Sequence, residues 1–135
     1  MKTVIAIFFI LFFLGCSDQG EVYVNDKKIF NTPIKCMQLS IFPPNKEMES
    51  TLKSLYQFDT NCSYELALSY KTDIVCNSNQ NWAQKTSGIP NGYIRIEIKK
   101  EGVLLYTYYK DLKGPLTDDK LIEGFNRLQD DLNLL

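Results

Sequence analysis

The stretch YIRIEIKKEGVLLYTYYKDL, residues 93–112, decides the fold of this 135-residue chain. Its first half alternates isoleucine with polar or aromatic residues, so the isoleucines share one face of a predicted strand. Glu101 and Gly102 can form a tight turn into a second strand, and the two strands together predict a β-hairpin. Tyr106 and Tyr108 lie on one face of the second strand and Tyr109 on the other. We expect these tyrosines to pack the sheet against a helix rather than to form a binding stripe.

Two segments with helical periodicity lie on either side of this hairpin in the sequence. Asn45 can cap a helix over residues 45–58, and Thr117 can cap another over residues 117–133. In the second segment, one stripe along the helix is formed by the apolar residues Leu121, Phe125, Leu128 and Leu132. Each helix is therefore predicted to pack its apolar face on a sheet.

Weaker strand signals complete the predicted sheet. SYELALSY, residues 63–70, alternates like the hairpin, and IKCMQLSIF, residues 34–42, is apolar enough for a buried strand. EVYVNDKKIF, residues 21–30, could form a short hairpin, and residues 74–76 predict a short strand. The predicted fold class is α+β, an antiparallel sheet of about four to six strands covered by two helices.

Residues 77–92, NSNQNWAQKTSGIPNG, are polar and rich in turn-forming residues, and they predict a long loop around the only tryptophan. Trp82 has little apolar company nearby in the sequence, so it either packs at the domain edge or serves as an anchor for a partner. The other candidates for partner binding are Ile89 and the exposed face of the 93–112 hairpin.

The N-terminus has the pattern of an export signal. Lys2 precedes an apolar stretch over residues 4–14, which is shorter than the about 20 residues that a membrane-spanning helix needs. We expect residues 1–15 to be removed as a signal peptide and residues 16–20 to form a tether. Residues 21–135 are then long enough for a single domain with one core.

Gly15 followed directly by Cys16 resembles the lipobox of bacterial lipoproteins. The resemblance implies cleavage before Cys16, a diacylglyceryl thioether on its thiol, and a fatty acyl chain such as palmitate on the new amine. Ser17 stands where that family has aspartate in proteins kept at the inner membrane, which implies the periplasmic face of the outer membrane. The alternatives are an uncleaved anchor and an ordinary signal peptide with a chance cysteine.

Three cysteines remain when Cys16 is set aside. A disulfide between Cys62 and Cys76 would close a loop of about 15 residues, worth roughly 3 kcal/mol in the chain-entropy model, and is the favoured pair. Cys36 could replace either partner, because distances cannot be read from a sequence. Since the chain has no histidine and no CxxC motif, no metal site is predicted.

Asn61-Cys62-Ser63 forms a sequon for N-linked glycosylation. Asp59, two residues before the asparagine, extends the resemblance to the sequon of bacterial N-linked systems. Asn61 is therefore a candidate glycosylation site, which requires it to lie on an exposed turn. The motif also has a chance explanation, because its residue types are common in this composition.

Most classes of enzyme and of nucleic-acid-binding protein do not fit this composition. A chain without histidine has no Ser-His or Cys-His couple, and it contains no Gly-rich phosphate loop. Loss of residues 1–15 would leave 14 basic and 16 acidic residues, with only two arginines, which disfavours binding to nucleic acid. We expect no catalytic residue and no cofactor.

The order of elements resembles that of small envelope-assembly lipoproteins, such as the lipopolysaccharide-transport lipoprotein and the auxiliary lipoproteins of ABC-type transporters. This resemblance implies a non-enzymatic lipoprotein that binds or stabilises a larger membrane complex through a protein partner in the envelope. The alternatives are a periplasmic ligand-binding or inhibitor module, and a structural spacer associated with the cell wall.

Overall fold

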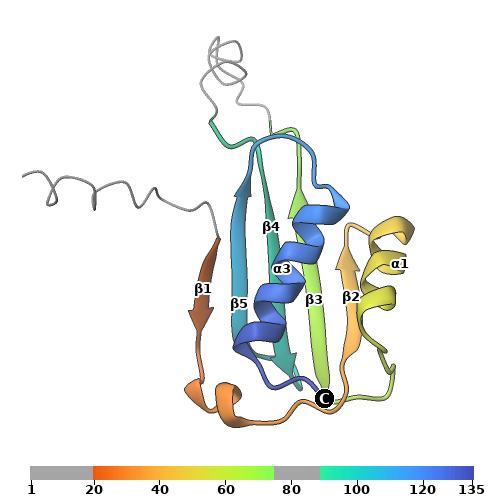
Figure 1. Ribbon diagram of the computed structural model, residues 1–135, viewed down its shortest axis with the longest axis vertical. Coiled ribbons are helices and arrows are strands. Elements are labelled where there is room, and N and C mark those ends of the chain that lie inside the picture. The colour runs from red at the N-terminus through yellow and green to blue at the C-terminus, as the bar shows by residue number, and fades with distance from the viewer. Residues whose placement is uncertain (1–19, 75–88) are drawn as a thin grey trace, which may run out of the picture.

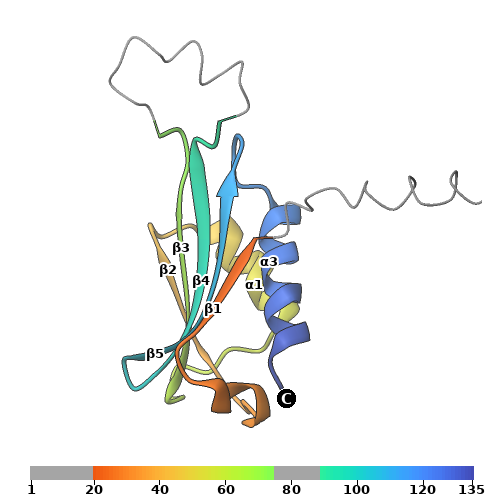
Figure 2. The same cartoon turned by 90° about the vertical axis from the view of Figure 1, so that its left-hand side faces the viewer.

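Two α-helices cover one face of a five-stranded sheet in the computed structural model, which describes residues 20–74 and 89–135 (Figures 1 and 2). The strand order is β1-β5-β4-β3-β2. The strands are β1 (Glu21–Val24), β2 (Gln38–Phe42), β3 (Tyr64–Lys71), β4 (Gly92–Lys100) and β5 (Val103–Leu112). The helices are α1 (Lys46–Leu55) and α3 (Asp118–Asp131), and a short 3-10 helix, η1, spans Lys27–Asn31. This arrangement confirms the predicted α+β class.

The predicted hairpin forms the centre of the sheet. Strands β4 and β5 pair antiparallel, and the turn between them places Glu101 and Gly102 at φ values of 50° and 81°, the left-handed region that short hairpin turns use. The isoleucines of β4 are buried, as are Tyr106 and Tyr108 of β5. The expectation that the tyrosines of this strand belong to the core is therefore confirmed for Tyr106 and Tyr108, whereas Tyr109 is half-buried on the opposite face of the sheet.

Both predicted helices form, and their apolar stripes face the sheet. The Asn45 side chain accepts hydrogen bonds from the backbone N–H groups of Glu47 and Met48 at 3.0 and 3.1 Å, which caps α1 as expected. Thr117 precedes α3, but its side chain makes no capping hydrogen bond. The predicted stripe of α3 is buried through Leu121, Phe125, Leu128 and Leu132.

The predicted antiparallel pairing is confirmed for three of the four strand pairs, and the fourth pair is parallel, so the sheet is mixed. Strand β2 pairs parallel to β3, because α1 carries the chain back to the starting end of β2 before β3 begins. Strand β2 also lies at an edge of the sheet, and its side chains are half-buried or exposed rather than fully buried.

The N-terminal segment does not form the hairpin predicted for residues 21–30. Strand β1 pairs with β5 instead, and the Asp26 side chain accepts a hydrogen bond from the Lys28 backbone N–H at 2.9 Å, which starts η1. The strand predicted at residues 74–76 is not formed at Ile74, which follows β3 as irregular chain. The rest of that predicted strand lies outside the described residues.

Cys62 forms its disulfide with Cys36, so the favoured pairing of Cys62 with Cys76 is wrong and the alternative partner is the observed one. The S–S distance is 1.99 Å and the Cα–Cα distance is 5.8 Å. Parallel pairing of β2 and β3 explains this choice, because it places the residues before the two strands side by side at one end of the sheet. Cys76 lies outside the described residues.

Candidate functional site

The sheet face opposite the helices carries no further layer within residues 20–74 and 89–135 (Figure 2). Its side chains alternate with the buried ones along each strand, so their identities are not dictated by the core. We call this surface the open face, and its principal side chains are Glu21, Tyr23, Phe42, Ser69, Tyr93, Arg95, Glu97, Lys99, Thr107, Tyr109 and Asp111.

One cross-strand row runs over all five strands of the open face. The register places Phe42 beside Ser69, Ser69 beside Arg95, Arg95 beside Tyr109, and Tyr109 beside Glu21. With neighbouring strands about 4.8 Å apart, this row is about 19 Å long. Its two ends differ, because one carries an apolar phenyl ring and the other a carboxylate.

Aromatic side chains gather on the β4, β5 and β1 side of the open face. The rings of Tyr93 and Tyr109 stack with centroids 5.8 Å apart and planes inclined by 22°. The Tyr109 hydroxyl donates a hydrogen bond to Asp111 at 2.9 Å, and the exposed Tyr23 hydroxyl donates to Glu21.

Burial and neighbouring carboxylates make these two hydroxyls less acidic. The pKa of Tyr109 is raised, mainly by burial and then by the hydrogen bond to Asp111. The pKa of Tyr23 is also raised, mainly by its hydrogen bond to Glu21. Both phenols are therefore neutral hydrogen-bond donors at neutral pH.

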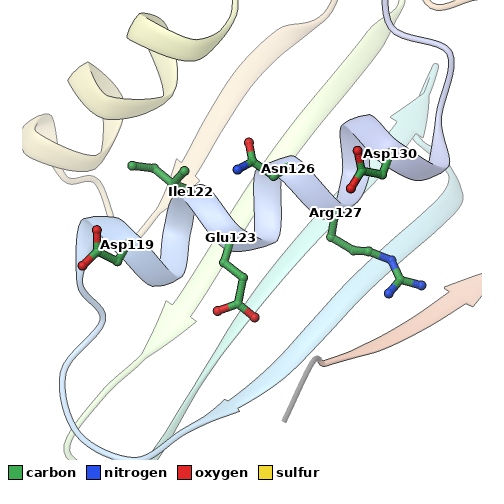
Figure 3. A pocket seen from close by; sticks show the side chains of 6 residues that line it. All are labelled: Asp119, Ile122, Glu123, Asn126, Arg127 and Asp130. Carbon is green, nitrogen blue, oxygen red and sulfur yellow. The ribbon is translucent and has the colours of Figure 1, made fainter. Parts of the chain in front are cut away.

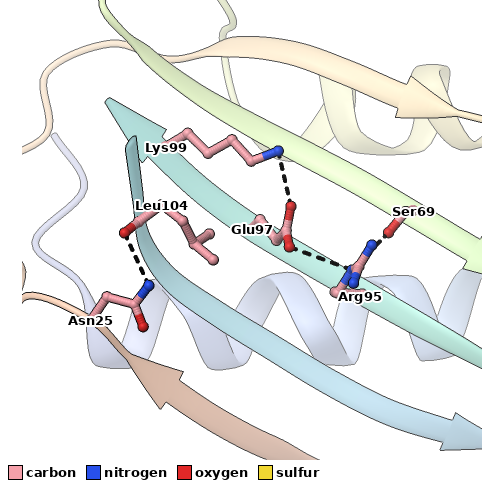
Figure 4. A network of polar contacts seen from close by, with 6 residues as sticks. All are labelled: Asn25, Ser69, Arg95, Glu97, Lys99 and Leu104. Carbon is pink, nitrogen blue, oxygen red and sulfur yellow. Dashed lines mark hydrogen bonds and ion pairs between the residues drawn. The ribbon is translucent and has the colours of Figure 1, made fainter. Parts of the chain in front are cut away.

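A ladder of charged residues lies along β4 on the same face (Figure 4). Glu97, whose side chain is only 14% exposed, lies 3.0 Å from Lys99 and 3.5 Å from Arg95. The Arg95 Nε also donates a hydrogen bond to the Ser69 hydroxyl at 3.1 Å. Because each charge has a partner of opposite sign, this ladder suits recognition of another polar surface better than acid–base catalysis.

The outer face of α3 bears a shallow depression of about 500 Å³. Figure 3 shows the six side chains that line it, which are Asp119, Ile122, Glu123, Asn126, Arg127 and Asp130. Two of them already hold structural partners, since Glu123 lies 2.8 Å from Lys110 and Arg127 lies 3.0 Å from Asp131. These ion pairs tie α3 to the sheet and to its own last turn.

A second depression, of about 680 Å³, lies beside the disulfide. It is formed by residues 35–36, 55–60, 129 and 134–135, and includes both apolar and polar groups. No local pattern in the sequence predicts this surface, because the segments that form it are far apart in the chain.

The residues predicted as sites fall in different places. Ile89 is 51% exposed and lies just before β4, at the end of the sheet rather than within the open face. Asn61 is exposed in a turn, where its backbone N–H donates to the Asp59 carboxylate at 2.9 Å, while Cys62 within the sequon is buried by its disulfide. Trp82 and Cys16 lie outside the described residues.

No helix within residues 20–74 and 89–135 is long and apolar enough to cross a membrane. No group of three or more histidine, cysteine, aspartate or glutamate side chains there could hold a metal ion. Comparison with known protein families, with characterised proteins and with solved structures finds no match.

Proposed function

We propose that this protein is a non-enzymatic lipoprotein of the bacterial cell envelope, anchored through Cys16, that binds a protein partner of a larger membrane complex through its open face. The observation that carries the proposal is the contrast between the two faces of the sheet. Helices α1 and α3 cover one face, whereas the other carries stacked tyrosines and paired charges and has no covering layer within the described residues.

The composition of the open face favours a protein as its partner. Tyrosine and arginine are enriched in the energetic centres of protein interfaces, and Tyr93, Tyr109 and Arg95 lie together here. Acidic and basic side chains are interleaved, as in the ladder through Glu97, so no polyanion would be attracted over the whole surface. A partner with alternating charges of its own would complement it.

The lipid anchor supports a partner in the membrane or next to it. Two or three acyl chains on Cys16 would hold the domain on a bilayer almost permanently. Confinement to one membrane raises the effective concentration of any partner in the same membrane, so even a modest interface can form a lasting complex.

The test is to isolate the tagged, lipidated protein from gently solubilised envelopes and to identify its stoichiometric partners by mass spectrometry. A Tyr93→Thr, Tyr109→Thr double variant removes both stacked rings while keeping residues that favour strands. We expect recovery of the partner to fall about tenfold or more, as when an interface aromatic worth at least about 1.4 kcal/mol is lost.

The matched control is Asn126→Ala, an exposed change on α3 that leaves the open face intact. Recovery of the partner should be unchanged in this variant. Equal recovery of the partner with the unmodified protein, the double tyrosine variant and Asn126→Ala would contradict the docking role of the open face. Recovery of a soluble protein alone, with no envelope component, would favour the inhibitor alternative.

A further inference from the structure

The two edges of the sheet differ in how well they are protected against the addition of another strand. Strand β1 forms one edge with only four residues, and it begins with the charged Glu21. Strand β2 forms the other edge, and its sequence QLSIF contains no charged residue, although 23% of the chain is charged. Proteins commonly protect an edge strand with lysine, proline or a bulge, and β2 has none of these within its five residues.

One row of backbone groups along β2 faces away from the sheet. Among residues 20–74 and 89–135, the only strand that pairs with β2 is β3, in a continuous parallel register over residues 38–42. The N–H and C=O groups on the other side of an edge strand have no neighbouring strand to bond with. Another extended backbone matches this row of donors and acceptors, which is how strand addition recognises a peptide.

Helix α1 lies where it would cover a strand added to β2. In Figure 1 this helix lies on the outer side of β2, so it extends beyond the edge of the sheet, and Figure 2 shows it on the same side of the sheet as α3. Leu39 and Ile41 pair with core residues of β3 and therefore face the helices, but they are only half-buried. A strand added at this edge would bury both side chains further and continue the core under α1.

The side of α1 that borders this edge carries no net charge. The Thr51 hydroxyl donates a hydrogen bond to Asp118 of α3 at 3.1 Å, so the Thr51 side of α1 faces α3. Glu49 and Lys53 are each two residues from Thr51, about 200° around the helix, and project from the opposite side. They form an ion pair at 2.5 Å, so an added strand would meet balanced charges there and needs no charge of its own.

We propose that β2 is a strand-addition site, at which an extended, uncharged segment of a protein partner, with apolar residues at alternate positions, pairs with the free edge beneath α1. This inference rests on the proposed function only in that the partner is a protein, since the edge of β2 and the open face are different surfaces. The inner side chains of the segment pack on Leu39 and Ile41, and the outer ones lie beside Phe42, which is 74% exposed. Main-chain hydrogen bonds supply affinity, and the alternate side chains supply specificity.

A second copy of this chain is the competing occupant of the edge. Antiparallel pairing of two β2 strands about a two-fold axis at Ser40 would place Leu39 opposite Ile41 of the second copy, which suits apolar contact. The same axis keeps both helix layers on one side of the joined sheet, so both α1 helices would lie over the same strip beyond β2. Because packed helices need about 8–10 Å between their axes, a segment without its own helix layer fits this edge better than a second copy.

The experiment measures amide hydrogen exchange in the full tagged protein, both in complexes captured from gently solubilised envelopes and after purification to homogeneity. In the purified protein, the outward N–H groups of residues 38–42 should exchange quickly, because they have no backbone acceptor. In the captured complex we expect them to exchange at least about tenfold more slowly, because each gains an acceptor on the added strand. Strand β1, the other edge, is the control within the same protein, and its exchange should not change.

A matched pair of variants tests the same contact through recovery of the partner. Ser40→Lys places a charge on the free edge, as natural edge strands do to prevent pairing, and Ser50→Lys places the same charge on α1. Both serines are exposed, and folding of the variants is checked by circular dichroism. We expect Ser40→Lys to lower recovery of the partner about tenfold and Ser50→Lys to leave it unchanged.

The outcomes separate strand addition from docking on the open face. A captured partner with residues 38–42 exchanging as fast as in the purified protein overturns strand addition alone, and so does equal recovery with the two lysine variants. Slow exchange of residues 38–42 in a purified protein of twice the chain mass shows the second copy as the occupant and overturns the proposed one. Envelopes that yield no stoichiometric partner overturn both strand addition and docking on the open face.

Discussion

Removal of the disulfide should cost this fold a large part of its stability. Cys36 and Cys62 are 26 residues apart in the sequence, and the loop between them contains β2 and α1. In the chain-entropy model, closing a loop of this length destabilises the unfolded state by about 3.5 kcal/mol. Since small domains are stable by only about 5–15 kcal/mol, the loss is a substantial fraction of the total.

The assay is equilibrium urea unfolding of Cys76→Ala and of the Cys36→Ala, Cys76→Ala double variant. The shared Cys76→Ala change prevents the freed Cys62 from finding another partner, so the difference between the two proteins reports the observed disulfide. Cys36 is only partly buried, so its truncation leaves little cavity to confuse the result. In thermal unfolding, 3.5 kcal/mol corresponds to about 14 °C for a domain of roughly 115 residues.

Reducing agent provides an independent check on the same quantity. It should lower the stability of the Cys76→Ala protein to that of the double variant and leave the double variant unchanged. Two results would refute the reasoning. One is a Cys76→Ala protein whose stability does not change when reductant is added. The other is a non-reduced peptide map of the unmodified protein in which Cys62 is joined to Cys76.

Three further predictions concern particular contacts of the fold. Asn45→Ala should destabilise the domain by about 1 kcal/mol, because the two capped N–H groups of α1 lose their acceptor, as measured by urea unfolding. Gly124→Ala should destabilise it by about 1–3 kcal/mol in the same assay despite the higher helix propensity of alanine, because the new Cβ would lie 2.9 Å from the ring of buried Tyr108; unchanged or increased stability would contradict this close packing. Burial and the hydrogen bond to Asp131 raise the pKa of Tyr106, so the unfolded state ionises first and stability should fall as the pH rises above about 10. Tyr106→Phe should reduce this alkaline loss, and an unaltered pH profile would show that other groups cause it.

Local patterns in the sequence were sufficient to predict the centre of this fold. The alternation in residues 93–112 fixes which side chains of β4 and β5 face the helices, since a strand turns successive side chains to opposite sides. The Asn45 side-chain oxygen caps the N–H groups of Glu47 and Met48, which follow it closely in the chain, so this cap also depends only on local sequence. Such features depend on residues that are close together in the chain, so they can be predicted from a single sequence.

Non-local pairings were the features that the sequence could not reveal. Strand β1 joins β5, more than 80 residues later, and four residues of sequence do not specify that partner. The parallel pairing of β2 with β3 follows from where α1 delivers the chain, and the disulfide partner of Cys62 follows from that pairing in turn. The parallel pairing of β2 with β3 therefore explains two differences from the prediction, the mixed sheet and the disulfide partner of Cys62.

The role of the open face could not be predicted from core packing, because its side chains lie on the side of the sheet away from the core. The stacked pair of Tyr93 and Tyr109 has a purely structural explanation, since a cross-strand aromatic pair stabilises a sheet by about 0.2–1 kcal/mol. Docking of a protein partner is a second explanation for the pair. The two explanations differ in whether removal of the rings changes the free energy of unfolding or the recovery of the partner. Sheet stabilisation alone predicts a small loss of unfolding free energy and full recovery of the partner, whereas docking predicts a loss of the partner from a protein that remains folded. Because the pair lies beside Arg95 and is covered by no other element of the described chain, we expect the second outcome.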